Sequence, residues 1–222
     1  MNLALFDLDG TLIEGDSDHA FGEFIVAQGW ADAKVHRQRN DAFYRQYQAG
    51  TLDIDEYIDF TTSAWRGRPL AEQAALIQRF MAEVMAPQLL PPAHALLQAH
   101  CAAGDLIAIV TATNEFITRP IADALGVAHL LAVQLERDAE GRATGRIHGV
   151  PSFREGKIAR VHHWLAGLGQ TLGGFERSVF YSDSTNDLPL LDIVSEPVAT
   201  NPSPALAAIA QDRGWRILRL FE

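Results

Sequence analysis

One stretch near the N-terminus, Leu3–Thr11, constrains the fold more than any other. An uninterrupted apolar run of strand length ends there in two aspartates, Asp7 and Asp9, which Gly10 follows. Such a run is typical of a parallel sheet buried on both faces, and the alternation of side chains along a strand places both aspartates on the same side. Two carboxylates at a strand end repel each other unless a cation lies between them. An ordinary turn is the alternative, because Asp-Gly is a common turn dipeptide.

From Pro91 onward the sequence alternates between helical and extended patterns with short connections. This alternation predicts an α/β fold with a doubly wound parallel sheet, in which functional side chains gather at the carboxyl ends of the strands. We expect further strands at Leu106–Val110, Leu130–Leu135, Ser178–Tyr181, Pro197–Thr200 and Trp215–Leu220, a hairpin turning at Glu140-Gly141, and helices at Ala93–Ala103, Glu115–Leu125, Lys157–Leu168, Pro189–Ile193 and Pro204–Arg213.

The region from Gly15 to about Pro87 differs because it shows helical periods only. It separates the first strand from the second, so we interpret it as an insertion standing over the carboxyl edge of the sheet. The expected domains are a core of residues 1–14 and 88–222 and a helical cap of residues 15–87. The helices expected in the cap are His19–Gln28, Val35–Gln48, Ile54–Ala64 and Leu70–Val84.

Composition excludes several classes of partner. The 222 residues carry a formal charge of −10 without a cluster of Lys and Arg, so binding to a nucleic-acid backbone is not expected. A single cysteine rules out an intrachain disulfide framework and suggests a reducing compartment. No apolar stretch approaches the length of a membrane span. We therefore expect a cytoplasmic monomer or weak homodimer.

Three further polar clusters follow predicted strands or turns. Thr111–Asn114 opens a helix, where free N–H groups can bind an anion, although a plain helix cap is the simpler interpretation. Lys157 stands at the head of another helix, an electrostatically unfavourable place, and the only other lysine is Lys34. The segment Ser182–Asp187 combines acids and hydroxyls, and Asp183 ends its strand as Asp7 does. The two carboxylates are therefore placed to share one cation.

In order along the chain, Asp7–Thr11, Thr111, Lys157 and Asp183–Asp187 resemble the four motifs of the haloacid dehalogenase superfamily of phosphatases. The helical insertion is similar to the type-one cap of that superfamily. The resemblance covers essentially the whole chain, and four ordered motifs at strand ends are highly specific. Within the superfamily the chain looks most similar to the phosphoserine phosphatase-like branch.

The resemblance implies a phosphoryl transfer in two steps. Asp7 would attack phosphorus and form an aspartyl-phosphate, and Asp9 would protonate the leaving alcohol and then deprotonate the attacking water. The presence of an acid at Asp9 favours hydrolysis. The resemblance also implies Mg²⁺ as cofactor and supporting roles for other residues. Mg²⁺ would be bound by the Asp7 and Asp183 carboxylates and the Asp9 carbonyl, phosphate by Thr111, Ala112 and Lys157, and Asn186 and Asp187 would orient the groups around the metal and the lysine.

Substrate choice depends on the cap. The segments Gly15–His19 and Arg39–Tyr44 resemble a bacterial group that includes histidinol-phosphatases of this superfamily. Asp16, with Asp18 or Asp41, would bind a cationic group on a small phosphorylated metabolite. The best candidate is histidinol phosphate, which carries an ammonium and an imidazole but no carboxylate. Three aromatic residues of the cap would either contact this cationic substrate or only pack the helices of the cap, namely Phe43, Tyr44 and Trp65.

Other functions stay open at this point. A phosphoserine phosphatase would also need a cap arginine for the substrate carboxylate, and its second motif favours Ser-Gly-Gly where this chain has Thr111-Ala112-Thr113. A phosphotransferase would pass the phosphoryl group to a sugar hydroxyl. A receiver-like signalling domain is disfavoured because it lacks the helical insertion. The arginines available for a carboxylate are Arg39, Arg45, Arg66 and Arg68.

Overall fold

The computed structural model describes residues 1–221 and contains a six-stranded sheet in which every neighbouring pair is parallel. The strand order is β3-β2-β1-β6-β7-β8, so the predicted doubly wound α/β fold is confirmed. The apolar N-terminal run forms the central strand β1, which is fully buried between β2 and β6. The strands are β1 (Leu3–Phe6), β2 (Leu106–Asn114), β3 (His129–Val133), β6 (Ser178–Ser182), β7 (Glu196–Thr200) and β8 (Arg216–Leu218).

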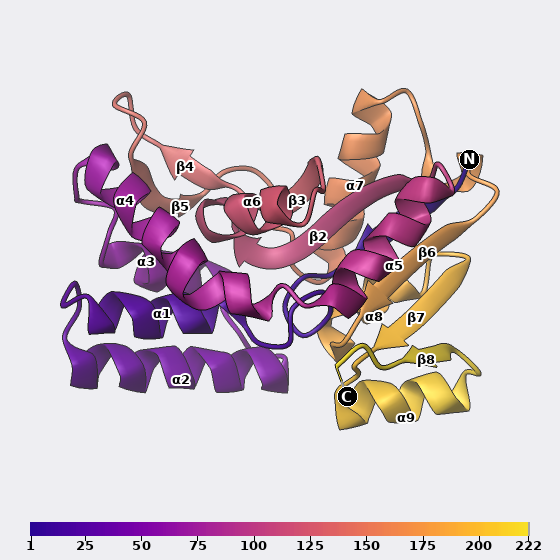
Figure 1. Cartoon of the computed structure of the whole chain (residues 1–222), viewed down its shortest axis with the longest axis horizontal. Helices are drawn as coiled ribbons and strands as arrows, with labels where there is room; N and C mark the ends of the chain where they lie inside the picture. Colours follow the sequence, from indigo (N-terminus) through magenta and orange to yellow (C-terminus); the bar gives the residue numbers. More distant parts are fainter. Residues whose placement is uncertain (222) are drawn as a thin grey trace.

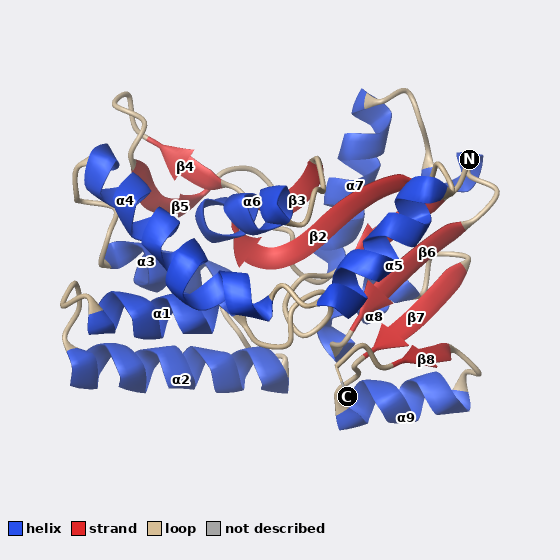
Figure 2. Cartoon of the chain, in the orientation of Figure 1, coloured by secondary structure: helices blue, strands red, loops and turns tan. Residues whose placement is uncertain are grey.

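Helices cover both faces of this sheet (Figures 1 and 2). Side chains alternate along β1, so Leu3 and Leu5 pack with one set of helices, while Ala4 and Phe6 pack with the other. The first set contains α7 (Glu155–Gly167), α8 (Leu188–Leu191) and α9 (Pro204–Asp212), and the second contains α5 (Pro91–Ala102) and α6 (Glu115–Ala124).

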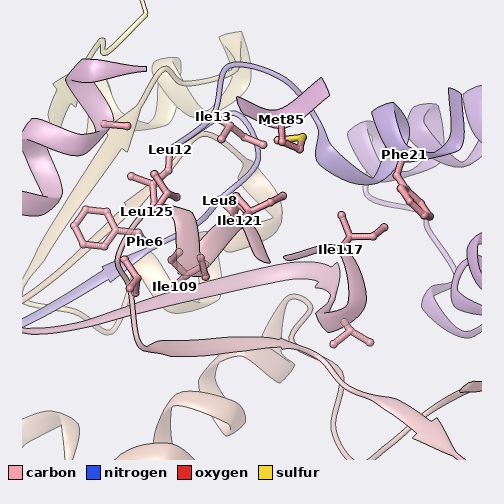
Figure 3. Close-up of a cluster of buried hydrophobic side chains, with 14 of the residues drawn as sticks. Phe6, Leu8, Leu12, Ile13, Phe21, Met85, Ile109, Ile117, Ile121 and Leu125 are labelled. Carbon is pink, nitrogen blue, oxygen red and sulfur yellow. The ribbon is translucent and has the colours of Figure 1, made fainter. Parts of the chain in front are cut away.

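Residues 15–87, in the connection between β1 and β2, form four α-helices, as predicted, and these helices gather beside the sheet in Figure 1. The fourth is shorter than expected because its last turn continues as a π-helical turn over Met81–Met85. A buried cluster runs without interruption from the sheet into this helical block, joining Phe6 and Ile121 to Phe21 and Met85 (Figure 3). The helices are α1 (Ser17–Ala27), α2 (Ala33–Ala49), α3 (Ile54–Ser63) and α4 (Leu70–Phe80).

The predicted hairpin turning at Glu140-Gly141 forms a separate antiparallel pair, β4 (Leu135–Arg137) and β5 (Ala143–Ile147). It leaves the sheet and packs against helix α3 of the helical block. Leu135 and Ala143 thereby join the apolar cluster that the block shares with the sheet. The block is thus held from two directions, by its own connections and by this hairpin.

Candidate active site

The ends of β1 and β6 meet a lysine that reaches them from helix α7. The Lys157 Nζ lies 3.0 Å from Asp7 Oδ1 and 2.8 Å from Asp187 Oδ2, and its side chain is only 1% exposed. Ser182 donates a further hydrogen bond to Asp187 Oδ2, at 2.7 Å. Lys157 is thus clamped between two carboxylates contributed by different strand ends.

Burial and charge set the ionisation of this group. Burial lowers the pKa of Lys157, but Asp187 and Asp7 outweigh it, so the pKa is raised and the side chain stays cationic. Burial raises the pKa of Asp7 to about 7, opposed by Lys157 and reinforced by Asp187 and Asp9. One buried cation therefore faces more carboxylate charge than it can neutralise.

Asp9 lies beside this group, and its two oxygens are held from opposite sides. The Ser17 peptide N–H, in the first turn of α1, donates to Oδ1 at 2.6 Å. The Thr113 hydroxyl, near the end of β2, donates to Oδ2 at 2.9 Å. The intervening Leu8 is fully buried in the apolar cluster, so Asp7 and Asp9 lie on the same side of the chain, as the strand alternation predicts. Burial raises the pKa of Asp9, and the hydrogen bonds from Ser17 and Thr113 oppose this rise.

A pocket opens between these aspartates and helices α2 and α3, and we call it the inner pocket. Its volume is about 30 Å³, enough for roughly one water molecule. On the other side of Asp9 lies a wider opening of about 480 Å³, which we call the outer cleft. The inner pocket is lined by Asp7, Asp9, Asp16, Phe43, Tyr44, Tyr47, Leu52, Ile54, Tyr57, Thr111, Ala112 and Thr113.

Thr111 and Ala112, the expected phosphate-binding residues, lie in the inner pocket together with Asp7 and Asp9. The local structure is not the predicted turn, because β2 continues through Thr111 to Asn114 and the helix begins only at Glu115. The Thr111 hydroxyl accepts a hydrogen bond from the Thr113 N–H at 3.1 Å. Its own proton is therefore directed elsewhere and is available to an anion.

Asp183 lines the outer cleft and lies against Gly10, where any Cβ would collide with the Asp183 carboxylate. Gly10 also has a φ of +69°, so glycine is required there twice over. Burial raises the pKa of Asp183 well above its usual value, and Asp7 and Asp187 raise it further. Asn201, which no sequence signal identified, fixes this loop by donating to the Gly10 carbonyl at 2.9 Å.

The structure allows a test of whether these residues suit Mg²⁺. Within residues 1–221 no group of three His, Cys, Asp or Glu side chains is placed to hold a metal. The expected ligand set needs only two carboxylates, those of Asp7 and Asp183, together with the Asp9 carbonyl, because Mg²⁺ keeps several of its waters. Burial raises the pKa values of Asp7 and Asp183, and neighbouring carboxylates raise them further. A divalent cation would compensate the negative charge gathered there. The oxygen-only donor set suits Mg²⁺ as well.

The three acids expected to choose the substrate lie in different environments. Asp16 lines both the inner pocket and the outer cleft while capping α1 through the His19 N–H, at 2.8 Å. Burial, followed by the charge of Asp9, raises the pKa of Asp16 to about 7. Asp18 is buried and lines neither space. Burial, followed by the charge of Asp16, raises the pKa of Asp18 well above its usual value, and Tyr57 opposes only part of this rise. Asp41 is on the surface, paired with His19 at 3.0 Å, and lines neither space.

The aromatic residues are also sorted by the structure. Phe43 and Tyr44 line the inner pocket, whereas Trp65 is buried against Phe116, with ring centroids 4.1 Å apart, and packs the core. Two tyrosines that the sequence argument did not single out, Tyr47 and Tyr57, complete the aromatic side of the pocket. The spacing of Phe43, Tyr44 and Tyr47 on one helix was the signal available for Tyr47.

None of the four candidate arginines lines the inner pocket or the outer cleft. Arg66 pairs with Asp59, and Arg39 and Arg68 lie over the rings of Phe60 and Trp30. Lys157 donates to Asp7 and Asp187 and is not among the residues that line either space. The described side chains around both spaces therefore offer a substrate acids, hydroxyls and aromatic rings, and no cation for a carboxylate.

Asn186 was expected beside the metal and the lysine, but its hydrogen bonds run toward helix α2. Its Nδ2 donates to the Tyr47 carbonyl at 2.8 Å, and its Oδ1 accepts from Arg154 Nε at 3.4 Å. Asp187, its neighbour, does contact Lys157. The segment Thr185–Asp187 thus touches the lysine with one residue and the helical block with the preceding one.

Comparisons with known proteins agree with this arrangement. A model of the haloacid dehalogenase-like hydrolase family matches residues 4–192. The chain is 44% identical over 217 residues to the histidinol-phosphatase of Neisseria meningitidis serogroup C, with 98% of each chain covered. It is 31% identical to the phosphoserine phosphatase SerB1 of Mycobacterium tuberculosis, covering 96% of this chain and 69% of that protein.

Solved structures give the same picture of the fold. A protein of unknown function from Bordetella pertussis Tohama I superposes with a TM-score of 0.93 at 48% identity, with 99% of both chains covered. A substrate-bound phosphoserine phosphatase superposes with a TM-score of 0.69 at 16% identity, covering 97% of this chain and 91% of that one. The second likeness concerns the fold alone.

Proposed function

The chain belongs to the haloacid dehalogenase-like hydrolase family, and from that premise we propose that it is a Mg²⁺-dependent phosphomonoester hydrolase acting on a small phosphorylated amine, histidinol phosphate first. The observation that carries the proposal is the buried Asp7–Lys157–Asp187 group, whose Asp7 lines the inner pocket together with Asp9. Hydrolysis of an anionic phosphate ester needs a nucleophile, a fixed cation that neutralises charge and an acid for the leaving oxygen, which Asp7, Lys157 and Asp9 supply in that order.

The proposed reaction assigns a step to each side chain. A carboxylate oxygen of Asp7 attacks phosphorus while Asp9 protonates the departing alcohol, and Asp9 then removes a proton from the water that cleaves the aspartyl-phosphate. Lys157 holds Asp7 in line and neutralises phosphoryl charge, and the Thr111 hydroxyl and Ala112 N–H hold phosphoryl oxygens. Asp7, the Asp9 carbonyl and Asp183 would bind Mg²⁺, which supplies Lewis-acid stabilisation of the phosphoryl oxygens.

The choice of substrate rests on the character of the two spaces. Asp16 offers an anion to a substrate ammonium, and Phe43, Tyr44 and Tyr57 offer aromatic faces to a ring or a cation. Within residues 1–221 no arginine lines either space, which disfavours a substrate carboxylate such as phosphoserine carries and histidinol phosphate lacks. The 44% identity to a histidinol-phosphatase supports the same choice.

The proposal also retains the division into a core of residues 1–14 and 88–222 and a cap of residues 15–87. Residues of both parts line the inner pocket, which in this conformation has room for little more than a water. Substrate entry therefore requires the cap to move, and the outer cleft is the natural entrance because it shares Asp9 and Asp16 with the inner pocket. No helix in residues 1–221 is long and apolar enough to cross a bilayer.

Phosphate release tests the proposal directly. The panel contains histidinol phosphate, phosphoserine, glycerol phosphate, a sugar phosphate and a nucleoside monophosphate, each with Mg²⁺ and with EDTA. We expect the highest kcat/KM with histidinol phosphate, loss of activity in EDTA, and recovery with Mg²⁺. Preference for phosphoserine would keep the chemistry and change the substrate. A lack of release from every compound, or full activity after thorough chelation, would contradict the proposed chemistry.

A further inference from the structure

The two oxygens of Asp9 have partners with different chemical abilities. Oδ1 is bound by the peptide N–H of Ser17 at 2.6 Å, and a peptide N–H can only donate. Oδ2 is bound by the Thr113 hydroxyl at 2.9 Å, and a hydroxyl can rotate, donate or accept. The Ser17 N–H is fixed by helix α1, so protonation of Oδ1 would weaken a short bond that cannot reorient. A proton on Asp9 is therefore better tolerated on Oδ2.

The backbone of β2 is shaped to deliver the Thr113 hydroxyl to that oxygen. Between Val110 and Asn114 the strand advances four residues while β3 advances two, from Leu131 to Val133, so two residues of β2 bulge out of register. A bulge re-aims side chains at a sheet edge. Thr113 is only 7% exposed, and it lines the inner pocket with Asp9. Its position follows from an irregularity that regular strand pairing would not produce.

We infer that Thr113 is a positioning residue for the proton transfers of Asp9, and that Oδ2 is the oxygen through which the proton passes; this inference rests on the proposed function. In the first step the Asp7–phosphorus bond forms, the bond from phosphorus to the ester oxygen breaks, and the proton moves from Oδ2 to that oxygen. In the second step a water oxygen bonds to phosphorus, the Asp7–phosphorus bond breaks, and the water proton moves to Oδ2. The Thr113 hydroxyl keeps Oδ2 oriented through both steps, because the hydrogen bond that it donates to Oδ2 strengthens when Asp9 is charged.

The inference separates Thr113 from an ordinary buried hydroxyl. Thr118 provides the comparison, because it is buried five residues further along and its hydroxyl donates to the Asn114 carbonyl at 2.9 Å. Removing the Thr118 hydroxyl alters one bond to the backbone and leaves Asp9 untouched. Removing the Thr113 hydroxyl frees Oδ2. Both changes are Thr→Val, so they alter size and polarity in the same way.

The experiment compares two substrates that differ in their need for an acid. Histidinol phosphate has a poor alkoxide leaving group, whereas the 4-nitrophenolate of 4-nitrophenyl phosphate leaves readily without protonation. The value of kcat/KM reports the steps through aspartyl-phosphate formation and so isolates the proton donation. We expect Thr113→Val to lower kcat/KM by about 10- to 100-fold with histidinol phosphate and by less than about threefold with 4-nitrophenyl phosphate. Thr113→Ser should restore most of the loss, and Thr118→Val should change neither value.

Three results would overturn the inference: equal losses on both substrates, no loss with histidinol phosphate, or a Thr113→Ser variant as impaired as Thr113→Val. A parallel loss in Thr118→Val would do the same, because the effect would then be one of packing. If Thr113→Val does not fold, as thermal unfolding would reveal, Thr113→Ala replaces it in the comparison with Thr113→Ser. If the unaltered protein hydrolysed neither histidinol phosphate nor 4-nitrophenyl phosphate, the proposed function would be refuted instead.

Discussion

The strand-end side and the cap side of the inner pocket are built on different principles. On the strand-end side, charged residues are almost fully buried and each contacts named partners, as Lys157 does with Asp7 and Asp187. On the cap side, Tyr44 and Tyr57 present rings from two helices and Asp16 presents a carboxylate at a helix start. The charged residues of the first side depend on one another, whereas the residues of the second side contribute separately. Chemistry and substrate choice should therefore respond separately to mutation.

The largest expected effect comes from Asp7→Asn, which acts on the strand-end side alone. The change is nearly isosteric, and Lys157 keeps its contact with Asp187, so the fold should persist while the nucleophile is lost. We expect kcat to fall by at least about 10⁴-fold on every substrate. When the unaltered protein is quenched in acid during reaction with a slow substrate and then digested, the phosphate should be found on Asp7. Appreciable turnover by the variant, or phosphate on another residue, would break the assignment.

Lys157→Met should affect both stability and activity. Removing the cation leaves Asp7 and Asp187 buried without a counter-charge, which we expect to cost about 3–5 kcal/mol in the free energy of unfolding without Mg²⁺. Activity should fall by at least about 10²-fold on all substrates, because the lysine also neutralises phosphoryl charge. Urea unfolding and phosphate release measure the two effects.

The matched control is Lys34→Met, since Lys34 is the only other lysine and is exposed near the start of α2. Lys34→Met should change the free energy of unfolding and the activation free energy of phosphate release by no more than about 0.5 kcal/mol each. A stable and active Lys157→Met variant would show that the buried group is not organised around its lysine.

The same contrast explains what could be predicted from the sequence. Asp7 and Lys157 were identifiable because each stands where a predicted strand ends or a predicted helix begins, and parallel strands bring those ends together. The role of Asp187 was implied by the family resemblance. The environment of the cap residues could not be predicted from the sequence, because it depends on how the cap helices are rotated about their axes when they pack. Asp41 lies on the same helix as Phe43 and Tyr44, yet it pairs with His19 and does not line the pocket.

Irregular backbone was the other limit of the sequence argument. Thr111 and Thr113 were expected in a turn, but β2 runs on to Asn114 through a bulge that no local pattern announces. The contact of Thr113 with Asp9 follows from that bulge. The family resemblance implied one role for Asn186 and Asp187 together, yet the Asn186 side chain donates to the Tyr47 carbonyl of α2.

Asp16→Asn acts on the cap side and should therefore discriminate between substrates. Loss of a partly desolvated ion pair with a substrate ammonium should cost about 1.5–3 kcal/mol, a tenfold to hundredfold drop in kcat/KM with histidinol phosphate. Glycerol phosphate, which has no cation, should be hydrolysed almost as before. Asparagine remains a good N-cap for α1, so the helix start is preserved. Equal losses on both substrates would make Asp16 a residue of cap folding and refute its proposed contact with the substrate.

The pH dependence sharpens this test. Because the pKa of Asp16 is raised to about 7, the carboxylate charge develops only as the pH rises from about 6 to 8. The advantage of histidinol phosphate over glycerol phosphate should grow across that interval in the unaltered protein and stay flat in Asp16→Asn. Ionisation of Asp16 has the opposite effect on folding stability. In the unfolded chain this carboxyl titrates near its usual value, so raising the pH from about 4 to 7 favours the unfolded chain over the folded one. At pH 8 the variant should thus be slightly more stable than the unaltered protein.

The smallest expected effect lies where the two sides meet, at Arg154. Helix α2 has no basic residue in its last turn, and Arg154 and Asn186 from the core approach its C-terminal end, where cations are favourable. Arg154→Ala should weaken this junction by about 0.5–1 kcal/mol, seen as a twofold to fivefold rise in KM with little change in kcat. Arg154 also has a φ of +50°, which glycine adopts without strain. Arg154→Gly should therefore match the KM of Arg154→Ala while unfolding at higher urea concentration. A KM unchanged in both variants would show that the junction does not influence closure over the substrate.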